Sequence, residues 1–250
     1  MSESFGTWKQ VEVAGKAVDV YEPSQPSEHN YVVLHLHGHG GRTLRDNAVY
    51  TAEFEKYGLR AVCPHGKRSW WGKRICTEFD AQISPVEYIR QHLMPYINEQ
   101  FGAEPPEIAV SGVSMGGQGA LRLAYWYPQE FPVVAALAPA VDFQNWLGQG
   151  IPLDEMYESP LDARQDTVTL QIHPLNWPPQ QFIACDPRDA DCFEGTDRLI
   201  SKLSSSGILY EKDLTTSAGG HSWEYFNHMA PATVEFLFRR LERERLKFRD

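Results

Sequence analysis

The sequence predicts an α/β protein with a mainly parallel central sheet and helices on both of its faces. From residue 30 onward, apolar strand patterns alternate with amphipathic helix patterns, and this alternation is typical of parallel βαβ units. The stretch "QVEVAGKAVDVYEP" at 10–23 shows two alternating strands around Ala14, Gly15 and Lys16. It predicts an antiparallel hairpin at one edge of the sheet. A chain of 250 residues, 42% of them hydrophobic, can form one such domain over 1–250.

The remaining elements are expected in the following order. Strands are expected within 30–37, 59–66, 106–117 (where the strand runs into a turn), 132–141, 180–186 and 209–216. Helices are expected within 45–58, 84–102, 117–128, 194–207 and 230–248. Residues 142–180 form a long polar and aromatic excursion between two strands. We expect it to pack over the sheet edge or over a pocket, in the manner of a lid, rather than to form a second domain.

The helix at 84–102 has the clearest end signals. Ser84 is its expected N-cap, Pro85 its first residue and Glu87 the partner of a capping box, and Gly102 marks its end. Pro95 is expected to kink it, because proline lacks the N–H that a helix interior requires.

Composition excludes several classes of partner. The chain has 23 Lys and Arg against 33 Asp and Glu, which gives a net charge of −10 and argues against a nucleic-acid partner. No apolar segment is long enough to span a membrane, and the start "MSESFGTWKQ" lacks the pattern of a secretory leader. We therefore expect a cytoplasmic protein without a membrane partner, and its oligomeric state stays open.

The cysteines do not indicate a metal or redox motif. Cys63, Cys76, Cys185 and Cys192 form no CxxC pair. We expect four reduced, buried thiols, and a disulfide between Cys185 and Cys192 is the alternative for an oxidising compartment.

The run "GVSMGG" at 112–117 matches GxSxG between an apolar strand and a helix. In that context the pattern predicts a nucleophile elbow, a sharp turn that exposes the hydroxyl of Ser114 at the carboxyl edge of the sheet. A phosphate-binding loop is disfavoured, because no GK[ST] ending follows.

A serine nucleophile needs a base and an orienting carboxylate, and both are expected downstream. His221 lies in the glycine-bearing loop "TTSAGGHSWEYF" before the last helix, and Asp186, Asp189 and Asp191 follow the preceding strand. The chain order Ser, Asp, His is that of an α/β-hydrolase.

These motifs together resemble the α/β-hydrolases of the esterase D and S-formylglutathione hydrolase type, sometimes grouped as putative esterases. The resemblance covers nearly the whole chain: "HLHGHGG" is similar to the family's HGxGG-like loop, "GVSMGG" to its elbow, "ACDPRD" to its CGxxD-like acid loop and "GGHSWEYF" to its histidine loop. It implies an α/β-hydrolase fold. Asp186 stands where the family has glycine, so Asp189 matches the acid and Asp186 is the second choice; Asp191 is expected at the surface.

The resemblance also implies an oxyanion hole made of backbone amides. One N–H would come from Met115, directly after the serine, and the other from His39 or Gly40 in the loop after the strand at 30–37. The alternative for the three histidines His35, His37 and His39 is a metal site, but no Asp-His pair follows His37 and further ligands are not evident.

Several large side chains are candidate walls of the substrate pocket. Trp70, Trp71 and Arg74 follow a strand at the edge where Ser114 is expected, and Trp223 and Trp177 are further candidates. Arg74 would receive a carboxylate of the substrate or pair with Glu78 at i,i+4, and the tryptophans would stack on a ring or fill the core.

The sequence therefore predicts a serine hydrolase that cleaves small to medium carboxylic esters through an acyl-enzyme, without a cofactor. S-formylglutathione-type thioesters and carbohydrate or phenolic esters are alternative substrates. A metal-dependent hydrolase and a non-catalytic binding protein of the same fold are the alternatives from other classes.

Overall fold

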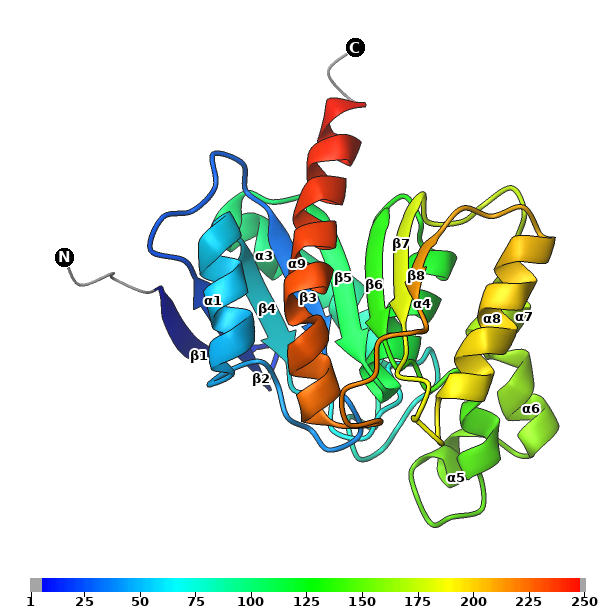
Figure 1. Cartoon of the computed structure of the whole chain (residues 1–250). Coiled ribbons are helices and arrows are strands. Elements are labelled where there is room, and N and C mark those ends of the chain that lie inside the picture. Colours follow the sequence, from blue (N-terminus) through cyan, green and yellow to red (C-terminus); the bar gives the residue numbers. More distant parts are fainter. Residues whose placement is uncertain (1–5, 248–250) are drawn as a thin grey trace.

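The computed structural model describes residues 6–247 and is built around an eight-stranded sheet (Figure 1). The strand order is β1-β2-β4-β3-β5-β6-β7-β8. The strands are β1 (Thr7–Val13), β2 (Lys16–Glu22), β3 (Val32–Leu36), β4 (Arg60–Pro64), β5 (Ile108–Val113), β6 (Val133–Leu137), β7 (Gln180–Ala184) and β8 (Glu211–Asp213). Only the pairs β1/β2 and β2/β4 are antiparallel among these strands. The predicted mainly parallel sheet is thus confirmed.

The expected hairpin forms the edge of this sheet. Val13 pairs with Lys16, so the turn has two residues, and both Ala14 (φ 47°) and Gly15 (φ 76°) are left-handed. Two left-handed residues make a turn whose twist matches that of the flanking strands.

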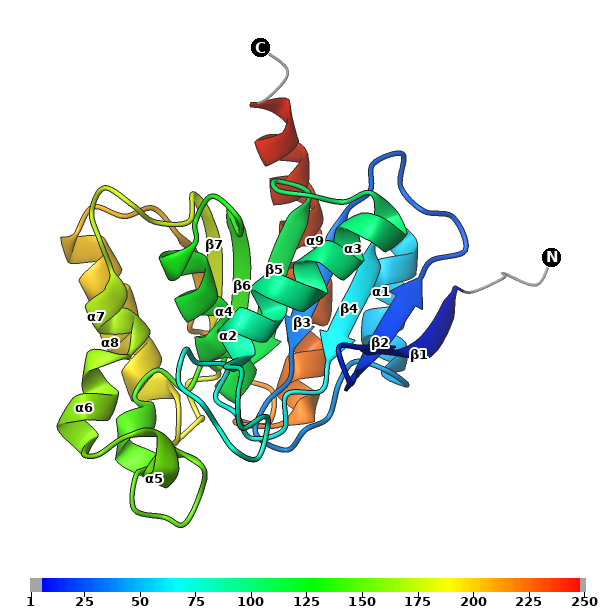
Figure 2. The ribbon, with the colours of Figure 1, turned by 180° about the vertical axis from the view of Figure 1, so that it is seen from behind.

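Helices cover both faces of the sheet. The helical segments are α1 (Ala48–Tyr57), α2 (Pro85–Tyr88), the π-helical η1 (Ile89–Leu93), α3 (Met94–Phe101), α4 (Met115–Trp126), the 3-10 helix η2 (Phe143–Trp146), α5 (Leu153–Met156), α6 (Pro160–Gln165), α7 (Val168–Gln171), α8 (Phe193–Ser205) and α9 (Trp223–Leu246). Figure 1 shows α1 and α9 in front of the sheet, and the reverse view shows α2, α3 and α4 across the other face (Figure 2).

The helix expected at 84–102 is divided into three pieces. Its start is confirmed, because Ser84 and Glu87 form the capping box. The expected disturbance at Pro95 takes the form of the π-helical turn η1, which ends one residue before α3. Pro95 then lies in the first turn of α3, so the helix is disturbed directly before the residue that lacks an N–H.

The start expected for the last helix is wrong. Helix α9 begins at Trp223 instead of residue 230, since the Ser222 side chain caps it by accepting from the Tyr225 N–H. Pro231 lies inside the helix, and burial of Tyr225, Phe226 and other residues of these first turns against the core offsets the lost hydrogen bond. Residue 248 of the expected segment lies outside the described residues.

The excursion at 142–180 contains η2, α5, α6 and α7. In Figure 1 the arrowheads of the parallel strands point down, and α5 and α6 lie at that end of the molecule. On the other side of the excursion, the Trp126 side chain of α4 donates to Gln171 in α7 at 3.1 Å. The excursion is therefore attached to the helix that follows Ser114.

All four cysteines are free and buried, as expected, and the alternative disulfide is absent. Within residues 6–247, no helix combines the length and the apolar character that a membrane crossing requires. The first five residues of the stretch inspected for a leader lie outside the described range.

Candidate active site

Ser114 occupies a sharp turn between β5 and α4. Its φ of 55° and ψ of −120° are strained for a residue with a side chain. The turn is tight because backbones touch on both sides: a Cβ at Gly112 would overlap the Gly116 carbonyl, and a Cβ at Gly116 would overlap the Leu36 carbonyl of β3. The glycines of "GVSMGG" therefore permit the elbow.

Two further loops bring a histidine and a carboxylate to this serine. His221, between β8 and α9, has its Nε2 2.9 Å from Ser114 Oγ, and its Nδ1 lies 2.6 Å from Asp189 Oδ2. With the Nδ1–H donated to the carboxylate, Nε2 is left to accept the serine proton. The Asp189 carboxylate is fully buried, whereas the His221 side chain keeps 28% of its surface exposed toward solvent.

The environment of Asp189 favours its charged form. Burial opposes ionisation, but the hydrogen bond from His221 and those from the amides of Cys192 (2.9 Å) and Asp191 (3.0 Å) outweigh it and lower the carboxyl pKa. A carboxylate held ionised beside a histidine stabilises that histidine when it takes up a proton.

Asp186, the other candidate acid, is also buried but serves a different task. It accepts the amides of Arg188 (2.8 Å), Ala218 (2.6 Å) and Gly220 (2.9 Å), so it ties the acid loop to the histidine loop. Burial again opposes ionisation, and these three amides lower its pKa nevertheless. In the structure Asp189 is hydrogen-bonded to His221, whereas Asp186 is hydrogen-bonded to the backbone of both loops. This bracing role is not visible in the sequence.

The two segments expected to supply oxyanion-hole amides lie next to Ser114. Met115 is the first residue of α4, so its N–H has no helical acceptor. The loop with His39 and Gly40 lies against the serine, since a Cβ at Gly38 would be 3.3 Å from the Ser114 Cβ. No hydrogen bond within residues 6–247 uses the amides of His39 or Gly40.

Two of the three histidines of "HLHGHGG", His35 and His37, make internal hydrogen bonds, whereas His39 lines the space beside Ser114. His35 is buried with its Nδ1 3.0 Å from Ser111 Oγ, and burial together with the neighbouring His37 lowers its pKa to about 3. His37 donates from Nδ1 to the Gly38 carbonyl (2.7 Å) and accepts the Gly66 amide at Nε2 (2.9 Å), and burial lowers its pKa to about 4. Both ring nitrogens of His37 are therefore occupied.

One group of at least three potential metal ligands occurs in the described part of the chain, and it consists of Asp189, Cys192 and His221. Two of these three form the hydrogen-bonded chain to Ser114. Burial raises the pKa of the Cys192 thiol, which disfavours the thiolate that a metal would need. This donor set fits a metal poorly.

Ser114 lies where two cavities meet, and both are also lined by His39 and His221. The first, the Trp223 cavity, measures about 260 Å³ and is otherwise lined mainly by Arg42, Trp223 and Phe226. The second, the Trp70 cavity, measures about 200 Å³ and is bordered by Trp70 together with Trp146, Gln149 and Ile151 of the excursion. An ester bond at Ser114 can extend its two halves into these two spaces.

Two of the five predicted wall residues line these cavities, namely Trp70 and Trp223. Trp71 is a core residue: its ring fits against Gly66 and Gly119, and its Nε1 donates to the His37 carbonyl at 3.0 Å. The side chains of adjacent residues point in different directions here, so only one of the paired tryptophans reaches the cavity.

The predictions for Arg74 and Trp177 are wrong. Arg74 binds Asp162 (2.7 Å) and the Met156 carbonyl (3.0 Å) of the excursion, whereas Glu78 pairs with Arg68 instead. Trp177 precedes β7 and therefore lies at the amino edge of the parallel strands, opposite the edge with Ser114.

Sequence inspection missed several wall residues, among them Arg42, Phe226, Trp146 and Ile151. Arg42 directly follows the glycines of the "HLHGHGG" loop, and Phe226 lies in the first turn of α9, five residues after His221. These positions next to predicted site residues were the available signal. Nothing local indicated Trp146 or Ile151, because the fold of the excursion decides where they lie.

Strand, elbow and helix, with a downstream acid and histidine brought to the serine, define the class of the α/β-hydrolases. Within it, the chain belongs to the family described as "Putative esterase", whose profile matches residues 16–237. The protein is a hydrolase enzyme of this esterase family.

Comparison with individual proteins agrees with this assignment. An S-formylglutathione hydrolase from Agrobacterium tumefaciens superposes with a TM-score of 0.73 at 19% identity, covering 94% of both chains. FphF, a fluorophosphonate-binding serine hydrolase of Staphylococcus aureus, gives a TM-score of 0.77 at 14% identity over 94% of this chain and 99% of its own. At these identities the likeness shows the shared fold.

A sequence relative is the diacylglycerol acyltransferase/mycolyltransferase Ag85A of Mycobacterium leprae. It is 28% identical over 111 residues, which are 41% of this chain. The match spans about a third (34%) of the length of that protein.

Proposed function

We propose that the protein is a serine esterase that hydrolyses small to medium carboxylic esters through an acyl-enzyme. The observation that carries this proposal is the continuous hydrogen-bonded chain from Ser114 through His221 to Asp189, with distances of 2.9 and 2.6 Å. A binding protein of the same fold would not require this arrangement of an exposed hydroxyl, a base and a buried acid.

In the first half-reaction, His221 Nε2 takes the proton of Ser114 while Oγ attacks the ester carbonyl carbon. The negative charge moves to the carbonyl oxygen, where the amides of Met115 and of His39 or Gly40 can donate to it. His221 then gives its proton to the leaving alcohol as the bond to that alcohol breaks. Asp189 holds the imidazole in the required tautomer and stabilises its charged form.

In the second half-reaction, water replaces the alcohol. His221 takes one proton from the water, the resulting oxygen attacks the acyl carbon, and the bond to Ser114 breaks as the proton returns to Oγ. The acid is released and the enzyme is restored. Every proton is transferred through His221, so this route needs no cofactor.

The cavities bound the size of the substrate. Spaces of about 260 and 200 Å³ on either side of Ser114 suit an ester with two modest halves. The aromatic walls Trp223 and Trp70 also support phenolic or carbohydrate esters, since rings stack on indoles. A thioester of the S-formylglutathione type is a second candidate, favoured by the structural likeness to the Agrobacterium tumefaciens hydrolase.

We further propose that residues 1–250 act as one domain in the cytoplasm. The four unpaired, buried thiols support that location, because cytoplasmic thiols stay reduced.

The decisive experiment is labelling with a fluorophosphonate, read by intact mass and peptide mapping. Wild-type protein should gain one adduct, located on Ser114, and Ser114→Ala and His221→Ala should gain none. A panel of carboxylic esters, acylated sugars and S-formylglutathione then ranks the substrates by kcat/KM. Folded wild-type protein that takes no label and cleaves no ester would refute the proposal.

A further inference from the structure

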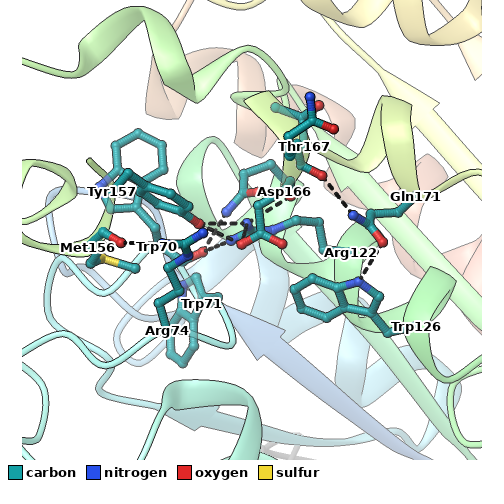
Figure 3. A network of polar contacts seen from close by, with 12 residues as sticks. Trp70, Trp71, Arg74, Arg122, Trp126, Met156, Tyr157, Asp166, Thr167 and Gln171 are labelled. Carbon is teal, nitrogen blue, oxygen red and sulfur yellow. Dashed lines mark hydrogen bonds and ion pairs between the residues drawn. The ribbon is translucent and has the colours of Figure 1, made fainter. Parts of the chain in front are cut away.

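Arg122 is a fully buried arginine in α4, the helix that begins directly after Ser114 (Figure 3). A buried guanidinium is costly unless its donors are paired. Its Nη2 donates to the Trp70 carbonyl at 2.7 Å, and its Nη1 donates to the Asp166 side chain at 3.2 Å and the Asp166 carbonyl at 3.1 Å. One side chain thus joins the segment that carries Trp70 to the excursion.

The backbone at Trp70 is strained and needs such support. Trp70 (φ 54°) and Trp71 (φ 49°) are consecutive bulky residues in the left-handed region, which persists only where the surroundings hold it. Gln118, one helical turn before Arg122, also donates to the Trp70 carbonyl, at 2.6 Å. Both donors are completely buried. The clamp on this carbonyl therefore comes entirely from α4.

The clamped residue is a wall of the Trp70 cavity. The Trp70 ring packs against Phe143 and Trp146 of the excursion, with centroid distances of 5.7 and 5.8 Å. The Arg122 guanidinium lies over one of these two rings, 4.8 Å from the centroid of Phe143. Phe143 in turn packs on Tyr157 at 5.6 Å, and the Tyr157 hydroxyl donates to Asp166 at 2.6 Å.

Arg122 therefore contacts the residues that hold both walls of the Trp70 cavity in place, but it does not itself line the cavity. On one side it holds the backbone of Trp70. On the other it holds Asp166 and Phe143, which belong to the excursion that supplies Trp146 and Ile151. A displacement of the Trp70 backbone, or of this part of the excursion, changes the width of the cavity beside Ser114.

We propose that Arg122 is a positioning residue: with Gln118 it fixes Trp70 against the excursion and so determines which esters the Trp70 cavity accepts. This role rests on the proposed esterase reaction at Ser114. It differs from a general contribution to stability, because it predicts an effect that depends on substrate size. An ion pair that only stabilises the fold affects all esters alike.

The test compares Arg122→Lys and Gln118→Met with wild type. Lysine keeps the positive charge, but one ammonium group cannot replace the fork that spans the Trp70 carbonyl and Asp166. Methionine at 118 removes one donor to the carbonyl and leaves the ion pair intact. The control is Arg90→Lys, because Arg90 also binds a carboxylate, through its Nε and Nη2 to Glu130 (2.9 and 2.6 Å), and lines neither cavity.

Two ester series are measured, one with acyl chains from acetate to octanoate and one with acetates of increasingly large alcohols. In one series, the ratio of kcat/KM between the largest and smallest ester should change about tenfold in both variants, mostly through KM. The control should keep the wild-type ratio. The series that responds identifies the half of the ester that enters the Trp70 cavity.

A double-mutant cycle with Trp70→Ala isolates the coupling. If Arg122 acts through Trp70, Arg122→Lys changes the size ratio in wild type and no longer changes it in Trp70→Ala. The inference is overturned if kcat/KM falls by the same factor for all esters, or if Arg122→Lys changes the size ratio equally in wild type and in Trp70→Ala. If Arg122→Lys does not fold, Gln118→Met carries the same cycle. Wild-type protein without ester hydrolysis overturns the proposed function instead, so the two failures are distinguishable.

Discussion

At the residue scale, two buried aspartates three positions apart divide the work of one loop. Asp189 hydrogen-bonds to His221, and Asp186 binds three backbone amides of the acid and histidine loops. Both carboxyl groups have lowered pKa values, so the pKa direction does not distinguish them. Only their partners do, and this difference can be tested by replacing each with its amide.

Asp189→Asn should lower kcat for a preferred ester by about 10³- to 10⁴-fold with little change in KM, since the amide no longer holds the imidazole in its productive tautomer. Asp186→Asn should instead lower the free energy of unfolding by about 1–3 kcal/mol and reduce kcat much less. Steady-state kinetics and urea unfolding of both variants check this. An active Asp189→Asn beside an inactive, folded Asp186→Asn would reverse the assignment.

The buried histidines make stability depend on pH. His35 and His37 have folded-state pKa values of about 3 and about 4, below the value of about 6.5 expected in the unfolded chain. At pH values between the folded and the unfolded pKa, the unfolded chain binds a proton at each histidine and the folded protein does not. The contribution of these histidines to the free energy of unfolding is therefore fully present above about pH 6.5 and is lost as the pH falls below it. The expected loss between pH 7 and pH 5 is about 2 kcal/mol for each histidine.

Urea unfolding at several pH values checks this, with His35→Asn as the comparison. The variant should lose about half of the pH dependence that His35 and His37 together cause, because one of these two groups is gone. An unchanged pH dependence would show that His35 is already protonated in the folded protein or that other groups dominate.

At the scale of elements, the position of α4 against β3 decides the geometry of the site. The helix approaches the strand so closely that a Cβ at Gly116 would overlap the Leu36 carbonyl. The same helix presents Ser114 at its start and the donors Gln118 and Arg122 in the next two turns. The placement of α4 therefore sets the positions of both Ser114 and the Trp70 backbone.

Gly116→Ala should consequently destabilise the protein by about 3 kcal/mol or more, because the clash is with backbone atoms that cannot move aside. Gly40→Ala is the matched control, as a Cβ there meets nothing within 4 Å, and its stability should stay within about 0.5 kcal/mol of wild type. Thermal unfolding of the two variants measures the difference. Equal stability of both would mean that α4 does not need this close approach.

At the scale of the whole molecule, the sheet brings three distant loops to one edge. The residues after β5, after β7 and after β8 meet there, and the excursion adds one wall of the Trp70 cavity. The "HLHGHGG" loop reaches the same edge, but His35 and His37 are used in internal hydrogen bonds. At this edge the hydrogen-bonded chain of Ser114, His221 and Asp189 supports the proposed serine mechanism, whereas the ring nitrogens of His35 and His37 that form hydrogen bonds are directed into the protein.

Ester hydrolysis should accordingly survive exhaustive dialysis against EDTA, within about twofold of the untreated rate, and should be lost in Ser114→Ala to the uncatalysed level or to about 10³-fold over it. Metal analysis of the dialysed protein confirms that the treatment worked. Activity that disappears on chelation and returns with zinc, while Ser114→Ala remains active, would favour the metal-dependent alternative.

The sequence by itself determined the alternation of strands and helices, the edge hairpin, the elbow at Ser114 and the capping box at Ser84. Each of these rests on a local rule: side-chain periodicity, a two-residue turn, glycines around a tight bend, or a cap and its partner three residues later. Such rules involve neighbours along the chain, so they can be read without coordinates. The start of α9 was misjudged because burial of its first turns outweighed the local effect of Pro231.

Only the tertiary structure decided which aspartate meets His221, which of the paired tryptophans reaches the cavity, and that Arg74 binds Asp162 instead of Glu78. The same holds for Arg122, whose place in a helix pattern says nothing of the Trp70 carbonyl or Asp166. These contacts join residues that are far apart in the chain, or they select one of two adjacent side chains. Their outcome depends on the packing of whole elements, which local sequence patterns do not encode.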